Sequence, residues 1–130
     1  MALNYPYQSE GYVPAYQISA MPFVTSSNVT LGQIKIINFG YVSRFVTIKN
    51  TGGSSTVMSV GFTENGLKTS NSNYFFLSGS EAFSGELRVT KLFISGSSGT
   101  PTFTVVAGLT TIPEQYMTPI TGSNGYPGVG

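Results

Sequence analysis

The chain has 130 residues and a net charge of +1, and its length suits one domain with a single core. Only 8% of its residues are charged, against about 25% in an ordinary soluble domain. This low charge excludes a basic surface that could neutralise several phosphates, so we expect no nucleic-acid partner. Because little charge repulsion keeps neighbours apart, we expect much of the surface to contact other protein. The alternative is an ordinary β domain that happens to be weakly charged.

Several reactive residue types are missing from the chain, which contains no Cys, His, Asp or Trp. Disulfides, thiol nucleophiles and Ser-His-Asp triads are therefore excluded, and the usual zinc ligands are nearly all lost. We expect no enzymatic activity, no metal site and no cofactor.

The N-terminal part of the chain predicts an extended arm at residues 1–22, rich in tyrosine and proline. Its opening, MALNYPYQSEG, lacks the basic and apolar regions of a secretory signal. No apolar run reaches 18 residues, so no membrane span is expected. Proline stiffens such a segment toward extended geometry, and tyrosine suits protein interfaces. We therefore expect the arm to lie along neighbouring subunits or across the surface of its own domain.

Residues 23–112 predict a β core, since Val, Ile, Thr, Phe and Tyr runs alternate with Gly/Ser turns. The candidate strands are 23–25, 31–39, 42–50, 57–63, 74–78, 82–89, 91–95 and 102–110. In 31–39, Ile34 and Ile36 have the opposite parity to Ile37 and Phe39, which predicts a bulge or burial on both faces. Strands 82–89 and 91–95 are either separate or continuous through a bulge. The loop between residues 64 and 73 is expected to be the most exposed connection.

In the last candidate strand, Phe103, Val105, Ala107 and Leu109 are predicted to point inward, because apolar and small polar residues alternate there. Residues 113–130 predict a second arm, rich in Pro and Gly. The tyrosines expected to form the assembly interface of the two arms are Tyr5, Tyr7, Tyr12, Tyr16, Tyr116 and Tyr126.

Eight short antiparallel strands predict an all-β fold, a compact β-sandwich with extended N- and C-terminal arms. A single jelly roll is favoured, and an immunoglobulin-type sandwich stays open because strand number does not separate the two. The loops of so compact a core are short, so no deep ligand pocket is expected.

Two weaker functional patterns remain. Glu81 and Glu86 are the one close pair of carboxylates, but across Ser84-Gly85 they need not share a face as a glycosidase pair must. A glycan-binding face is the other alternative, built from Tyr41, Tyr74 and the Asn-rich loop with Asn65, Asn71 and Asn73. Loop polarity and core aromatics explain the same residues more simply.

Several stretches carry a resemblance to a known group of proteins. They are GYVPAYQISAMPFVTSS, FVTIKNTG, VGFTENGL, FFLSGSEAFSGELRVTKLFISG, VVAGLTTIP and TGSNGYPGVG. Together they resemble the small virion proteins of large icosahedral double-stranded DNA viruses, notably algal viruses. In such capsids a small single jelly-roll protein forms the pentameric vertex, and other small proteins cement the shell of major capsid protein.

The resemblance implies a structural protein of the virion that is made in the host cytoplasm. Its expected partners are other copies of itself, in a homo-oligomer that is most simply a pentamer, and other capsid proteins. A vertex role is favoured over a cement role, and a glycan-binding fibre or decoration domain is the further alternative. The resemblance supplies no functional residues beyond the arms and the core.

Overall fold

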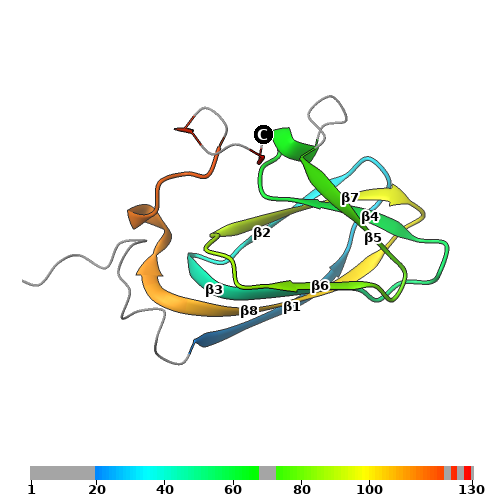
Figure 1. The fold of residues 1–130 in the computed structure, drawn as a ribbon. Helices are drawn as coiled ribbons and strands as arrows, with labels where there is room; N and C mark the ends of the chain where they lie inside the picture. The colour runs from blue at the N-terminus through cyan, green and yellow to red at the C-terminus, as the bar shows by residue number, and fades with distance from the viewer. Residues whose placement is uncertain (1–19, 68–72, 122–123, 126–127, 130) are drawn as a thin grey trace, which may run out of the picture.

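The strands of the core form two four-stranded antiparallel sheets in the computed structural model, which describes residues 20–67, 73–121, 124–125 and 128–129 (Figure 1). The strands are β1 (Met21–Asn28), β2 (Ile34–Asn38), β3 (Tyr41–Asn50), β4 (Val57–Gly61), β5 (Tyr74–Ser78), β6 (Ala82–Gly85), β7 (Lys91–Ser98) and β8 (Thr102–Pro113). Two single 3₁₀ turns are present, η1 (Asn65–Leu67) and η2 (Glu114–Tyr116). The all-β prediction is confirmed. Within the described residues, no helix has the length and hydrophobicity to cross a membrane.

The strand order identifies the sandwich as a jelly roll. One sheet has the order β1-β8-β3-β6 and the other β2-β7-β4-β5. The first strand therefore pairs with the eighth, the second with the seventh, the third with the sixth and the fourth with the fifth. This is one long antiparallel ribbon rolled into two sheets. An immunoglobulin-type sandwich has the orders ABED and CFG and pairs its first two strands, whereas β1 and β2 lie in different sheets.

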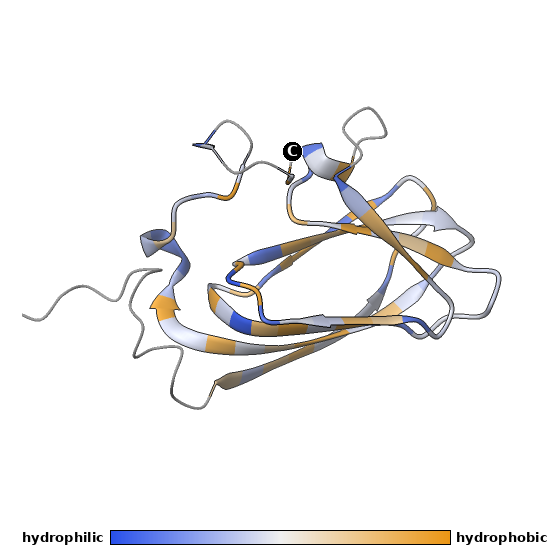
Figure 2. Ribbon diagram, in the orientation of Figure 1, coloured by the Kyte–Doolittle hydropathy of each residue, from blue (hydrophilic) through white to orange (hydrophobic). Residues whose placement is uncertain are grey.

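The hydrophobic core lies between the two sheets and follows the alternation predicted for β8. Phe103, Val105 and Ala107 are fully buried and Leu109 is nearly so. Across the core they meet the inward residues of the other sheet, including Met58 of β4. Figure 2 shows the corresponding apolar bands in strands of both sheets.

In β2, only one of the two apolar sets points into the core. Ile37 is buried, whereas Ile34 and Ile36 remain 37% and 50% exposed. The register with β7 is regular from Ile34 to Asn38, so β2 has no bulge. Both expected explanations of the parity change are therefore wrong. The second set lies on the outer face of the sheet, which is a solvent-exposed surface at these positions.

The chain between β6 and β7 leaves the sheet because a buried serine of β3 binds it. The register of β3 with β8 shifts around Ser43, which is fully buried. Ser43 donates its hydroxyl to the carbonyl of Leu87 and accepts the Val89 amide at 3.0 Å. Strand β6 therefore ends at Gly85, and the expected strand 82–89 is shorter than predicted and separate from β7.

A buried asparagine joins the two sheets at the opposite end of β3. Asn50 is fully buried and donates its side-chain amide to the carbonyl of Leu77 in β5 at 3.0 Å. Its side-chain oxygen accepts the Gly52 amide at 2.9 Å and so fixes the turn after β3. This side chain thus links a strand of one sheet to a strand of the other.

Candidate assembly surfaces

The outer face of the β2-β7-β4-β5 sheet carries a group of exposed and half-buried apolar side chains, here called the outer patch. It consists of Ile34, Ile36, Phe93, Tyr74 and Phe76. Phe76 is 55% exposed, and its ring packs edge-on against Tyr74 at 5.3 Å between centroids. Scattered exposed apolar residues are ordinary, whereas a contiguous group on one sheet face is typical of a protein interaction site.

The strand register shows that the outer patch is contiguous across the sheet. One row runs from Ile36 to Phe93, then to Gly61 and Tyr74. The next row runs from Ile34 through two serines to Phe76, and one of these, Ser59, pairs its hydroxyl with that of Ser97 at 2.6 Å. The face is therefore apolar at both edge strands. In its middle Ser59 and Gly61 are buried, and the Leu67 side chain lies over Gly61.

The outer face of the other sheet carries a second, smaller apolar group, here called the opposite patch, formed by Pro22, Val24 and Phe45. Val24 is 65% exposed and Phe45 is 37% exposed. A Cβ atom added at Gly108 would lie 2.2 Å from the Phe45 ring, so glycine is needed beneath that ring. Most of the remaining face is polar, and hydroxyls pair across its strands, as Ser26 does with Thr104 at 2.9 Å.

The C-terminal segment folds back onto its own domain. Met117 packs against the buried pair Val42 and Ile112, and Ile120 packs against the main core. Farther along, the carbonyl of Val129 accepts the hydroxyl of Thr63. This contact lies beside η1, where Figure 1 shows the C-terminal end. An arm was expected to lie along neighbouring subunits or across its own domain, and the described part of the C-terminal arm lies across its own domain.

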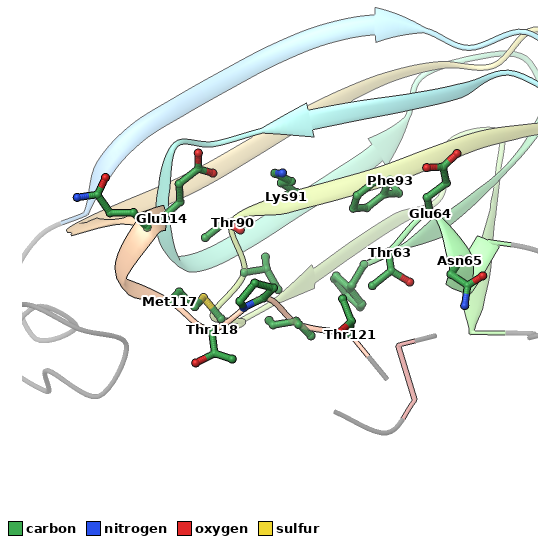
Figure 3. A pocket seen from close by; sticks show the side chains of 15 residues that line it. Thr63, Glu64, Asn65, Thr90, Lys91, Phe93, Glu114, Met117, Thr118 and Thr121 are labelled. Atoms are coloured by element: carbon green, nitrogen blue, oxygen red, sulfur yellow. The ribbon is translucent and has the colours of Figure 1, made fainter. Parts of the chain in front are cut away.

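A groove of about 780 Å³ lies between this C-terminal segment and the β-sandwich (Figure 3). Its apolar lining includes Phe62, Phe93, Met117 and Ile120. Phe93 also belongs to the outer patch, so the groove and the patch form one continuous surface. We expected no deep ligand pocket because the loops of the core are short. The groove is formed by a different part of the chain, the C-terminal segment that folds back onto the domain.

The polar part of the groove is rich in hydroxyls. Thr63, Thr90, Thr118 and Thr121 line it, as do the charged residues Glu64, Lys91 and Glu114. In Figure 3 the labelled side chains of Thr63, Phe93 and Met117 lie around the same space. Such a surface offers aromatic and aliphatic contacts together with hydrogen-bonding partners for neutral groups.

Most of the tyrosines predicted for the assembly interface, namely Tyr5, Tyr7, Tyr12, Tyr16 and Tyr126, lie outside the described residues. Tyr116 lies in η2 and is 43% exposed, next to the groove-lining residues Gln115 and Met117. Sequence reasoning missed the outer patch. The sequence signal for it is that Ile34 and Ile36 lie on the opposite strand face to Ile37 and Phe39.

The structure brings together only part of the two weaker patterns: Asn73, next to Tyr74, donates its backbone amide to the carbonyl of Gly66, next to Asn65. Glu81 and Glu86 flank the two ends of β6, with the four residues of the strand between them. Glu81 accepts the Ser78 amide at 2.8 Å and so stabilises a turn. Tyr41 and Tyr74 lie in different sheets, and Asn71 is outside the described residues. Where the structure describes the chain, no group of three or more carboxylates could hold a metal ion.

Comparisons with known proteins give weak likenesses. No protein-family model and no curated protein sequence matches the chain. A cobalt(II) HppE in complex with substrate has a TM-score of 0.43 at 16% identity, over 68% of this chain and 44% of that one.

Two Bacillus proteins are similar to the same degree. A disulfide-linked pilus of Bacillus endospore appendages has a TM-score of 0.37 at 14% identity, over 70% of this chain and 89% of that one. The Bacillus halodurans protein BH2720 has a TM-score of 0.42 at 10% identity, over 88% and 91% of the two chains. At these values none of the three assigns a function.

Proposed function

We propose that the chain is a non-enzymatic structural subunit of an icosahedral virion shell, acting as a pentameric vertex protein. The observation that carries the proposal is the outer patch, an apolar sheet face with exposed side chains on both edge strands, on a chain with 8% charged residues. Burying such a face against a neighbour is favourable, and few charges oppose it. The jelly roll supports the proposal because viral capsid domains use it, although lectins and cupins do as well.

A closed ring places a specific demand on the subunit. Around a five-fold axis each contact joins two different surfaces, since self-complementary patches produce two-fold dimers. The chain offers two different apolar surfaces, the outer patch on one sheet and the opposite patch on the other. We assign the ring contact to the outer patch of one copy and the opposite patch of the next.

The sheet face alone is too small for a stable interface. Four strands at ~4.8 Å spacing and five residues at ~3.3 Å each cover roughly 320 Å². A standard interface buries about 800 Å² on each partner. The arms are therefore required to supply the remaining contact area, which agrees with their weakly charged, tyrosine-containing composition.

The proposal is tested by placing a charge in the outer patch. Ile36→Lys and Phe76→Lys each remove exposed apolar surface and introduce a charge that loses its water in the contact. We expect the wild-type chain to form a ring in sedimentation analysis and both variants to sediment as monomers with unchanged circular dichroism. The control is Ser55→Lys, in an exposed turn.

Variants that assemble like the wild type would contradict the proposal. A wild-type chain that stays monomeric and binds only a major capsid protein would favour the cement role over the vertex role.

A further inference from the structure

The N-terminal segment, residues 1–19, joins the domain at the opposite patch. Ala20 is the first described residue, and a Cβ atom added at Gly108 would lie 2.6 Å from the Ala20 methyl group and 2.2 Å from the Phe45 ring. The segment therefore enters the fold on the outer face of the β1-β8-β3-β6 sheet. The groove lies between the segment that follows β8 and the residues around β7 and η1, and Phe93 joins it to the outer patch.

The segment has the length and chemistry of an extended ligand. It contains four tyrosines, two prolines and a single charged residue, Glu10. In polyproline geometry, at ~3.1 Å per residue, its 19 residues reach about 59 Å. Proline-rich segments dock into aromatic-lined grooves because their extended form loses little entropy on binding.

The groove matches such a ligand in its lining. Phe62 and Phe93 provide aromatic faces for proline and tyrosine rings, and Met117 provides an adaptable thioether side chain. Threonine hydroxyls, such as that of Thr90, offer hydrogen bonds to tyrosine hydroxyls. The groove also opens onto Ile36, which lies directly opposite Phe93 in the register, so a segment longer than the groove continues over the outer patch.

We infer that the groove is the receptor for the N-terminal segment of a neighbouring copy. The inference rests on the proposed ring. There the opposite patch of one copy meets the outer patch of the next, so Ala20 of the first lies beside the groove of the second. The segment is long enough to reach that groove as well as the groove of its own copy, whose lining includes Glu114 directly after β8. The neighbour's groove is assigned because a contact between two copies, unlike one within a copy, stabilises the ring. The segment then supplies the interface area that the sheet face lacks.

The test uses the full chain with benzoylphenylalanine in place of Tyr12, assembled from an equal mixture of unlabelled and ¹⁵N-labelled copies. After irradiation, mass spectrometry identifies the cross-linked peptides. We expect cross-links from the segment to residues 89–93 or 117–121, joining labelled to unlabelled copies. The matched control carries the same replacement at Ser55, an exposed residue of the turn between β3 and β4 that does not line the groove. It should label neither region.

Cross-links that join the segment only to its own copy, or only to β3 and β6, would overturn the inference. A second variant, Tyr12→Ser with Tyr16→Ser, leaves the described fold untouched, and we expect it to weaken assembly at least tenfold. If this double variant assembles like the wild type, the inference about the groove is wrong. The proposed function would still stand in that case if Ile36→Lys abolishes assembly. Failure of the wild-type chain to assemble would overturn both.

Discussion

Replacing Asn50 by alanine removes the polar link between the two sheets. The Asn50 side chain donates a hydrogen bond to the carbonyl of Leu77 and accepts one from the amide of Gly52. In the alanine variant this carbonyl and this amide would both lose their hydrogen-bond partner. Leu77 is 5% exposed, so water replaces the lost amide poorly. Each buried group left unsatisfied costs about 1–3 kcal/mol. We therefore expect Asn50→Ala to lower the free energy of unfolding by about 2–4 kcal/mol.

Urea unfolding followed by circular dichroism measures this loss, since a chain of this size is expected to unfold in one transition. The matched control is Asn38→Ala. Asn38 also accepts a backbone amide, from Gly40 at 3.0 Å, but in an exposed turn where water substitutes for the lost oxygen. We expect the control to cost about 0.5–1 kcal/mol. An Asn50 variant as stable as the Asn38 variant would refute the role assigned to this link.

Three further predictions concern packing, the C-terminal segment and the assembly contact. Gly79→Ala should cost about 1–3 kcal/mol in urea unfolding, because its Cβ atom would lie 2.2 Å from the Gly53 carbonyl oxygen, whereas Gly53→Ala meets nothing within 4 Å and should be neutral. Thr63→Val removes the donor to Val129 and the acceptor of the buried Gly66 amide, so limited proteolysis should cut the C-terminal segment faster than in the wild type, and equal rates would contradict its anchoring. Assembly should change little between about 0.05 and 0.5 M NaCl and strengthen in ammonium sulfate, because the contact is apolar. A strong loss of assembly in NaCl, measured by light scattering, would point to ion pairs instead.

Alternation along single strands was sufficient to predict the inner wall of the sandwich. Phe103, Val105, Ala107 and Leu109 are buried because a strand with one covered face repeats every two residues. The same rule does not say whether a second apolar set is covered by another layer. The strand with Ile34 and Ile36 was therefore expected to contain a bulge or to be buried on both faces. Instead, the two side chains form part of an exposed face.

Features that depend on distant residues could not be predicted from periodicity. The early end of β6 follows from Ser43, which binds the chain more than forty residues later. The fold-back of the C-terminal segment depends on Met117 and Ile120, two isolated apolar residues among Thr and Pro. The groove has lining residues from three separate parts of the chain, so no local motif announces it.

A cryo-electron microscopy map of the assembled particle would show directly whether a neighbouring subunit covers the outer patch. We expect the side chains of Ile36 and Phe76 to be covered in every copy by the neighbouring subunit around a five-fold axis. A map in which this face of the β2-β7-β4-β5 sheet points to solvent in all copies would contradict this expectation.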